Sequence, residues 1–162
     1  MEQIPDFWRT EVLHPLFVHF PIALLIMATV FKIATFWAKG KFLDLPGSIL
    51  LITGAVGGWL AIYTGDLADG AVSRSICDPT VLKAHENNAY TMIWLFTAAL
   101  IIDILYQFKF SKFKVFWAKV ILTLLMLIGS GYLAYVGHLG AQLVYQQAAG
   151  VYVPTDNCAE FN

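Results

Sequence analysis

Four long apolar segments separated by short polar stretches dominate this sequence, and they restrict the folds that are open to it. The segments run over about 15–37, 47–65, 87–108 and 120–145. Each is close to the length of about 20 residues that a helix needs to cross about 30 Å of hydrocarbon. Because only helices and closed barrels satisfy the backbone inside a bilayer, and no alternating strand pattern is present, we expect four transmembrane helices.

Composition agrees with a membrane domain. The chain is 59% apolar and only 13% charged, whereas soluble domains carry about 25% charged residues. This excludes a disordered chain, a nucleic-acid-binding protein and an ordinary cytosolic enzyme. We therefore expect one all-α membrane domain over residues 1–162. Since the connections are short, its natural packing is an up-down four-helix bundle.

Lysines cluster between the first two and between the last two apolar segments, and basic loops favour the cytoplasmic side. The expected orientation places both termini, an outer loop 66–84 and an outer tail 146–162 in the periplasm of a bacterial inner membrane. Lys32 is expected to extend to the inner interface, and Asp103 to pair with a lysine or the backbone. The lysines that set the orientation are Lys39, Lys41, Lys109, Lys112, Lys114 and Lys119.

The two cysteines fall on the same expected side of the membrane. Cys77 lies in the outer loop and Cys158 in the outer tail. Because disulfides persist in oxidising compartments, we expect a Cys77–Cys158 bridge, with two free thiols as the alternative. Their spacing gives no CxxC motif, so a catalytic thiol pair is not indicated.

All four histidines lie near the outer ends of the segments, and ionisable groups at membrane depth indicate function. Helix-bundle cores hold cofactors, and histidine is a standard haem ligand. We expect non-covalent haem b held by His19, His85 and His138, with His14 as the alternate ligand. Arg74 is expected to meet the propionates. No CxxCH motif is present, which excludes covalently attached haem.

A zinc or copper ion bound by the same four imidazoles is the alternative cofactor, because nitrogen ligands suit those metals too. Asp66, Asp69 or Glu86 would complete such a site. His14 and His19 point about 140° apart on an ideal helix, so they do not form a pair of ligands to one ion. Pro15 disfavours helical backbone at His14, which we expect at or just before the helix start.

Two motifs resemble a known family. The opening HPLFVHFPIALL, together with His85 and the closing GHLGAQLVYQQAAGV, resembles a bacterial membrane family catalogued as domain of unknown function 2231, over about residues 10–153. The resemblance implies a four-span domain in a redox neighbourhood, because members occur fused to Rieske or cytochrome c-like domains. Paired glycines are expected where this chain has Gly140 and Ala141. The motif positions carried onto this sequence are His14, Pro15, His19, Pro21, His85, Gly140, Leu143, Val144 and Tyr145.

These observations predict a b-type cytochrome-like electron-transfer protein rather than a stand-alone enzyme. Its expected partners are the lipid bilayer, a separate redox protein or larger membrane complex, and quinone, with no nucleic acid. The alternative function is a non-redox accessory subunit of a membrane complex, in which the histidines are polar contacts or a structural metal site. No internal repeat is apparent in the sequence.

Overall fold

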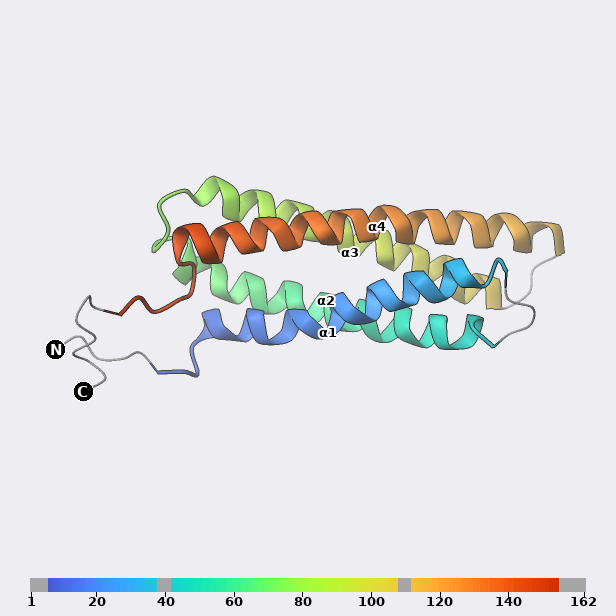
Figure 1. The fold of residues 1–162 in the computed structure, drawn as a ribbon, viewed down its shortest axis with the longest axis horizontal. Helices are drawn as coiled ribbons and strands as arrows, with labels where there is room; N and C mark the ends of the chain where they lie inside the picture. Colours follow the sequence, from blue (N-terminus) through green and yellow to red (C-terminus); the bar gives the residue numbers. More distant parts are fainter. Residues whose placement is uncertain (1–5, 38–41, 108–111, 155–162) are drawn as a thin grey trace.

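The computed structural model describes residues 6–37, 42–107 and 112–154, and these fold into four helices without a strand. Adjacent helices run in opposite directions along one long bundle (Figure 1). The all-α, up-down four-helix fold predicted from the apolar segments is therefore confirmed. The helices are α1 (Thr10–Ala34), α2 (Asp44–Val72), α3 (Pro79–Gln107) and α4 (Lys112–Gln147).

The helices extend beyond the apolar segments at one or both ends, and polar residues outside those segments continue the helical hydrogen bonding. The expected outer loop 66–84 is consequently helical over most of its length, and residues 73–78 alone connect α2 to α3. Asp78 caps α3, since its Oδ1 accepts a 2.9 Å hydrogen bond from the backbone N–H of Thr80. Pro79 occupies the first helical position, where its missing N–H costs no hydrogen bond.

The outside of the bundle is apolar. Phe20 is 77% exposed, Trp37 78% and Tyr145 88%, so large apolar side chains cover much of the surface. All four helices are long and apolar enough to cross a membrane. Such a surface is stable in lipid but not in water, and the chain is a membrane protein with four candidate spans.

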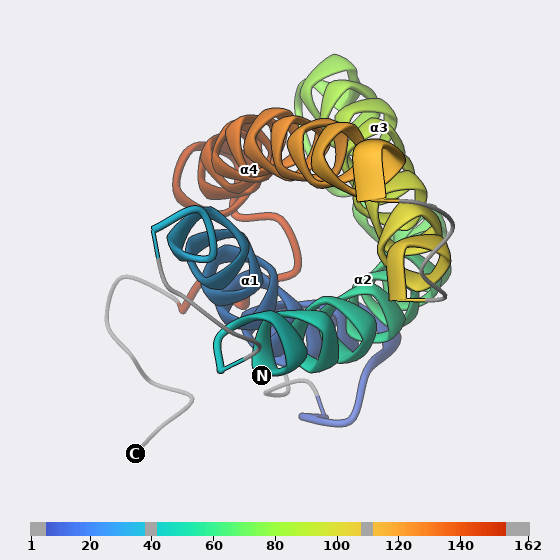
Figure 2. The same ribbon diagram turned by 90° about the vertical axis from the view of Figure 1, so that its right-hand side faces the viewer.

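Two helical hairpins make up the bundle. The helix α1 packs mainly along α2, and α3 along α4, while the seams between the hairpins are looser (Figure 2). Glycines allow the close approach within and between the hairpins. A Cβ added at Gly54 would lie 2.8 Å from Leu25, and one at Gly129 would lie 2.9 Å from the ring of Phe96.

The two ends of the bundle differ. At one end, which we call the lysine end, Lys32 turns into the bundle and is 1% exposed, so the expectation that it reaches the interface is wrong. Its Nζ donates to Asp44 Oδ1 at 2.8 Å, Ser48 Oγ at 2.8 Å and Asp103 Oδ1 at 2.6 Å. The predicted pairing of Asp103 with a lysine is confirmed. An apolar core separates this network from the other end; its largest members are Leu25, Leu51, Ile93, Phe96, Leu122 and Met126.

Candidate cofactor site between two histidines

A cavity of about 320 Å³ lies at the opposite end of the bundle, which we call the histidine end. All four helices contribute to its walls, and its lining is mostly apolar. The side nearest the apolar core is formed by Leu25, Met92 and Leu133. At this end α1 and α3 begin, α2 and α4 end, and the segments before α1 and after α4 meet through Arg9, which donates to the carbonyl of Gly150 at 3.2 Å.

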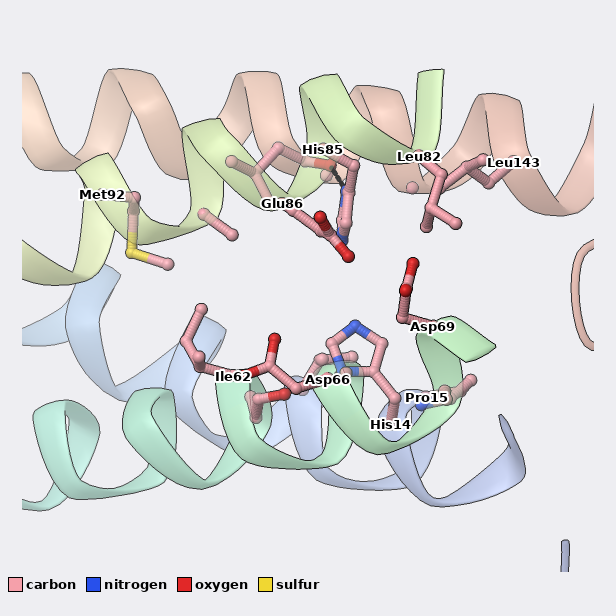
Figure 3. A pocket seen from close by; sticks show the side chains of 18 of the residues that line it. His14, Pro15, Ile62, Asp66, Asp69, Leu82, His85, Glu86, Met92 and Leu143 are labelled. Atoms are coloured by element: carbon pink, nitrogen blue, oxygen red, sulfur yellow. Dashed lines mark hydrogen bonds between the residues drawn. The ribbon is translucent and has the colours of Figure 1, made fainter. Parts of the chain in front are cut away.

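Two imidazoles face each other across this cavity. His14 comes from α1 and His85 from α3, so they approach from opposite hairpins. Their ring centroids are 6.0 Å apart and their planes cross at 88°. Figure 3 shows the Nε2 atoms of both rings directed toward one another.

The backbone of the neighbouring helix fixes each ring. The Nδ1 of His14 lies 2.9 Å from the carbonyl oxygen of Ala61 on α2, and the Nδ1 of His85 lies 3.1 Å from that of Val136 on α4. A carbonyl oxygen only accepts, so each Nδ1 is the donor. In its neutral form each ring therefore presents the lone pair of its Nε2 to the cavity. A histidine that donates its other ring nitrogen to a carbonyl is the usual arrangement of a metal ligand.

Carboxylates surround the mouth of the cavity. Glu11, Asp66, Asp69 and Glu86 all line it, and Asp69 and Glu86 point inward in Figure 3. Asp66 also accepts a 2.7 Å hydrogen bond from the hydroxyl of Tyr90, which joins α2 to α3. The three acids named from the sequence as additional metal ligands, Asp66, Asp69 and Glu86, are thus placed beside the histidine pair.

These acids do not complete a preformed site for a bare metal ion. Among the residues that the structure describes, no group of three or more His, Cys, Asp or Glu side chains lies close enough together to hold one. The described residues therefore supply a metal ion with two nitrogen ligands that face each other, and they leave its remaining coordination positions unfilled.

The structure brings together His14 and His85 but not the other two histidines. His19 and His138 are both exposed on the outside of the bundle and do not line the cavity. The expectation that they converge with His85 is corrected by helix geometry. His14 faces inward, so His19, about 140° away on α1, faces outward. On α4 the inward positions are taken by Val136 and Leu139, and His138 instead contacts Gln142 at 3.2 Å.

The start of α1 also differs from expectation. The helix begins at Thr10, so His14 is fully helical even though Pro15 follows it. The preference of a residue before proline for extended backbone is weak enough for the packing of α1 on α2 to override it. As a result the imidazole of His14 is held on a regular helix, at a defined height in the bundle.

Arg74 is placed away from the cavity. It is exposed in the connection after α2 and does not line the cavity walls, so it does not form the expected basic contact there. The charges that the structure places at the mouth are negative instead. The reason is that α2 continues past Gly65, which carries Arg74 more than two helical turns beyond the histidine pair.

Cys77 is exposed in the connection between α2 and α3 and forms no disulfide with the part of the chain that the structure describes. Cys158 lies outside the described residues, so the predicted bridge stays a prediction. The backbone N–H of Asp78 donates to Gln147 Oε1 at 2.7 Å, which places the residue next to Cys77 at the end of α4. The connection between α2 and α3 and the segment after α4 therefore lie close together at this point.

Two glycines pack against the histidines. Gly140 is one of the motif positions of the family resemblance, and the sequence did not predict a contact with an imidazole for either glycine. A Cβ at Gly65 would lie 3.1 Å from Nδ1 of His14, and a Cβ at Gly140 would lie 3.3 Å from Cε1 of His85. Each glycine follows its hydrogen-bonding carbonyl residue by four positions, one helical turn. Small residues were recognised in α2 and α4, but which imidazole rests on which glycine depends on helix packing that no local pattern contains.

The comparisons with known proteins identify a family and nothing more specific. The family model described as "Predicted membrane protein (DUF2231)" matches residues 10–152. No curated protein and no solved structure matches the chain.

Proposed function

The chain belongs to the DUF2231 family of predicted membrane proteins, and we propose that it is a b-type cytochrome-like electron carrier whose haem is held by His14 and His85. The observation that carries this proposal is the facing pair of imidazoles in an apolar cavity, each with its Nδ1 bound to a carbonyl and its Nε2 directed inward. The proposal keeps the cofactor expected from the sequence and keeps His85 as a ligand, but it replaces His19 and His138 with the alternate ligand, His14.

The spacing of the rings fits one metal ion between them. Imidazole nitrogens bind metal ions at about 2 Å, so two rings on opposite sides of one ion have centres about 6 Å apart. The centroids of His14 and His85 are 6.0 Å apart. Two protein ligands are enough for haem iron, because the macrocycle supplies the other four nitrogens. This agrees with a site in which two imidazoles face each other and no third ligand is assembled.

The walls of the cavity also suit a flat apolar group. Most of the lining residues are apolar, and Gly65 on α2 and Gly140 on α4 bring bare backbone up to the two imidazoles. A bound haem would supply one-electron chemistry. The chain's own residues would hold the iron, exclude water with their apolar walls, and place the centre near one membrane face.

A bound zinc or copper ion is the second candidate, and the carboxylates at the mouth favour it. Asp66, Asp69 and Glu86 lie beside the two histidines, and negative charge attracts a cation while it repels the propionates of haem. Both metals accept imidazole ligands. This candidate requires the acids to move toward the histidines when the ion binds, whereas haem iron needs no protein ligand besides the two imidazoles.

The partners follow from the position of the site. Electrons would be exchanged with a separate redox protein, a larger membrane complex or quinone at the histidine end. Lysine-rich connections at the opposite end support an orientation in which the histidine end faces the periplasm of a bacterial inner membrane. The accessory-subunit function requires no facing ligand pair, so the geometry favours it less.

The test uses absorbance spectra of the full chain purified in detergent, before and after dithionite, together with metal analysis. His14→Ala and His85→Ala should each lose the reduced α band of bis-histidine haem b, because one axial ligand is removed. His19→Ala and His138→Ala are matched controls. His19 lies on α1, as His14 does, and His138 lies on α4, which packs along the helix of His85. Both variants should keep the α band, because these rings lie outside the cavity.

The outcomes separate the candidates. Loss of haem in the two control variants, with retention in His14→Ala, would overturn the assigned ligands. A colourless preparation from cells supplied with a haem precursor would overturn the haem proposal. Stoichiometric copper or zinc that is lost in His14→Ala would then establish the second candidate, and a metal-free protein would leave the accessory role.

A further inference from the structure

The two hairpins build the same half-site twice. In the first hairpin His14 donates to the carbonyl of Ala61 and rests against Gly65; in the second His85 donates to the carbonyl of Val136 and rests against Gly140. In both cases the histidine lies early in the first helix, and the carbonyl and the glycine are one turn apart near the end of the second. This structural repeat is not apparent in the sequence.

Each half-site holds its imidazole from two directions. The hydrogen bond at Nδ1 fixes where one edge of the ring lies, at 2.9 Å for His14 and 3.1 Å for His85. The glycine supplies a bare stretch of backbone against which the ring rests. Any Cβ there would come within 3.1 Å of His14 or 3.3 Å of His85, closer than an ordinary van der Waals contact, so the ring would have to shift.

The consequence of holding both rings is a fixed angle between them. The ring planes cross at 88°, and Figure 3 shows His85 edge-on where His14 is seen nearly face-on. Hydrogen bonds from a ligating histidine to a carbonyl set the orientation of its ring. Since both carbonyls belong to rigid helices, the crossed arrangement is built into the packing of the hairpins.

The angle between axial imidazole planes affects the electronic structure of ferric haem. Parallel rings interact with the same iron d orbital and split the upper pair of occupied orbitals. Perpendicular rings interact with one orbital each and leave that pair nearly degenerate. The first case gives a rhombic low-spin EPR spectrum, and the second a strongly anisotropic one with a single very large g value.

We infer that Gly65 and Gly140 are positioning residues that hold His14 and His85 with crossed planes, so that haem bound between them has perpendicular axial ligands. This inference rests on the proposed function. It goes further, because haem binding alone requires two imidazoles but no particular angle between them.

The test is low-temperature EPR of the oxidised, haem-loaded full chain in detergent. The wild-type protein should give the strongly anisotropic low-spin signal. Gly65→Ala and Gly140→Ala should each shift the largest g value downward, toward that of parallel rings, because the displaced ring turns away from its carbonyl. Gly70→Ala on α2 and Gly131→Ala on α4 are matched controls, and neither should move the signal, since a Cβ there meets no histidine.

The possible results distinguish this inference from the function on which it rests. A rhombic wild-type spectrum with His14 and His85 as ligands would overturn the crossed planes and leave the haem function standing. A protein without haem overturns both. If Gly65→Ala or Gly140→Ala fails to fold, the wild-type spectrum still decides the angle. An unchanged signal in folded Gly65→Ala and Gly140→Ala would overturn the role of the glycines.

Discussion

Lys32 shows how strongly one buried charge can constrain a membrane bundle. Its ammonium group lies among Asp44, Ser48 and Asp103, so one residue of α1 is bonded to both α2 and α3. An ion of either sign is expensive to bury without its partners. The network therefore acts as a fixed junction of three helices at the lysine end.

Replacing Lys32 with methionine should destabilise the bundle strongly. The substitution leaves Asp44 and Asp103 without their shared cation, and breaking a buried pair costs about 3–5 kcal/mol. Thermal unfolding in detergent should show a large fall in the midpoint. Lys83→Met is the matched control, because Lys83 pairs with Glu86 at the exposed surface, and its midpoint should barely change. Equal midpoints for Lys32→Met and wild type would contradict a stabilising network.

At the scale of elements, the contact between α3 and α4 depends on the absence of a side chain at Gly129. A Cβ there would lie 2.9 Å from the ring of Phe96, which is fully buried and cannot turn away. Two residues further on, a Cβ at Gly131 would meet nothing within 4 Å. The same helix thus offers a required glycine and a free one.

Gly129→Ala should lower the free energy of unfolding by about 1–3 kcal/mol, the usual cost of overpacking a well-filled core. Gly131→Ala should leave it unchanged or raise it by about 0.4–1 kcal/mol, because alanine restricts the unfolded chain. The measurement is the unfolding midpoint of each variant in the same detergent. A Gly129→Ala protein as stable as Gly131→Ala would show that α3 and α4 do not pack as closely as described.

The elements also show what a sequence can and cannot predict. Length and apolarity predict four helices, because hydrocarbon leaves the backbone few alternatives. Helix direction follows from short connections. The inward face of each helix does not follow, since all faces are apolar, and this is why His19 and His138 were expected inside. His14 was only the alternate ligand, because the residue before a proline is usually not helical.

At the scale of the whole molecule, the connection after α2 and the segment after α4 meet at the histidine end. We expect Cys77 and Cys158 to form a disulfide there, which would close a loop of about 80 residues and stabilise the fold by about 4 kcal/mol. Asp78, next to Cys77, already contacts Gln147 at the end of α4. A bridge found in the protein would also indicate that the histidine end faces an oxidising compartment, because disulfides persist there.

The disulfide is checked by labelling the denatured protein with a polymer-linked maleimide. Wild type from the membrane should gain two labels only after reduction, and Cys77→Ser should gain one label at Cys158 without reduction. Reductant should also lower the unfolding midpoint of wild type but not of Cys77→Ser. Two labels on unreduced wild type would show that both thiols are free.

The apolar core between the two ends limits the passage of ions and polar ligands through the bundle. Leu25, Phe96 and Met126 are each 0% exposed, and they lie between the imidazole pair and the charged junction around Lys32. Among the residues that the structure describes, no side-chain hydrogen bond or ion pair connects the imidazole pair with this junction. An ion or polar ligand that enters the cavity between His14 and His85 therefore meets an apolar barrier before the lysine end, and it leaves by the side from which it entered.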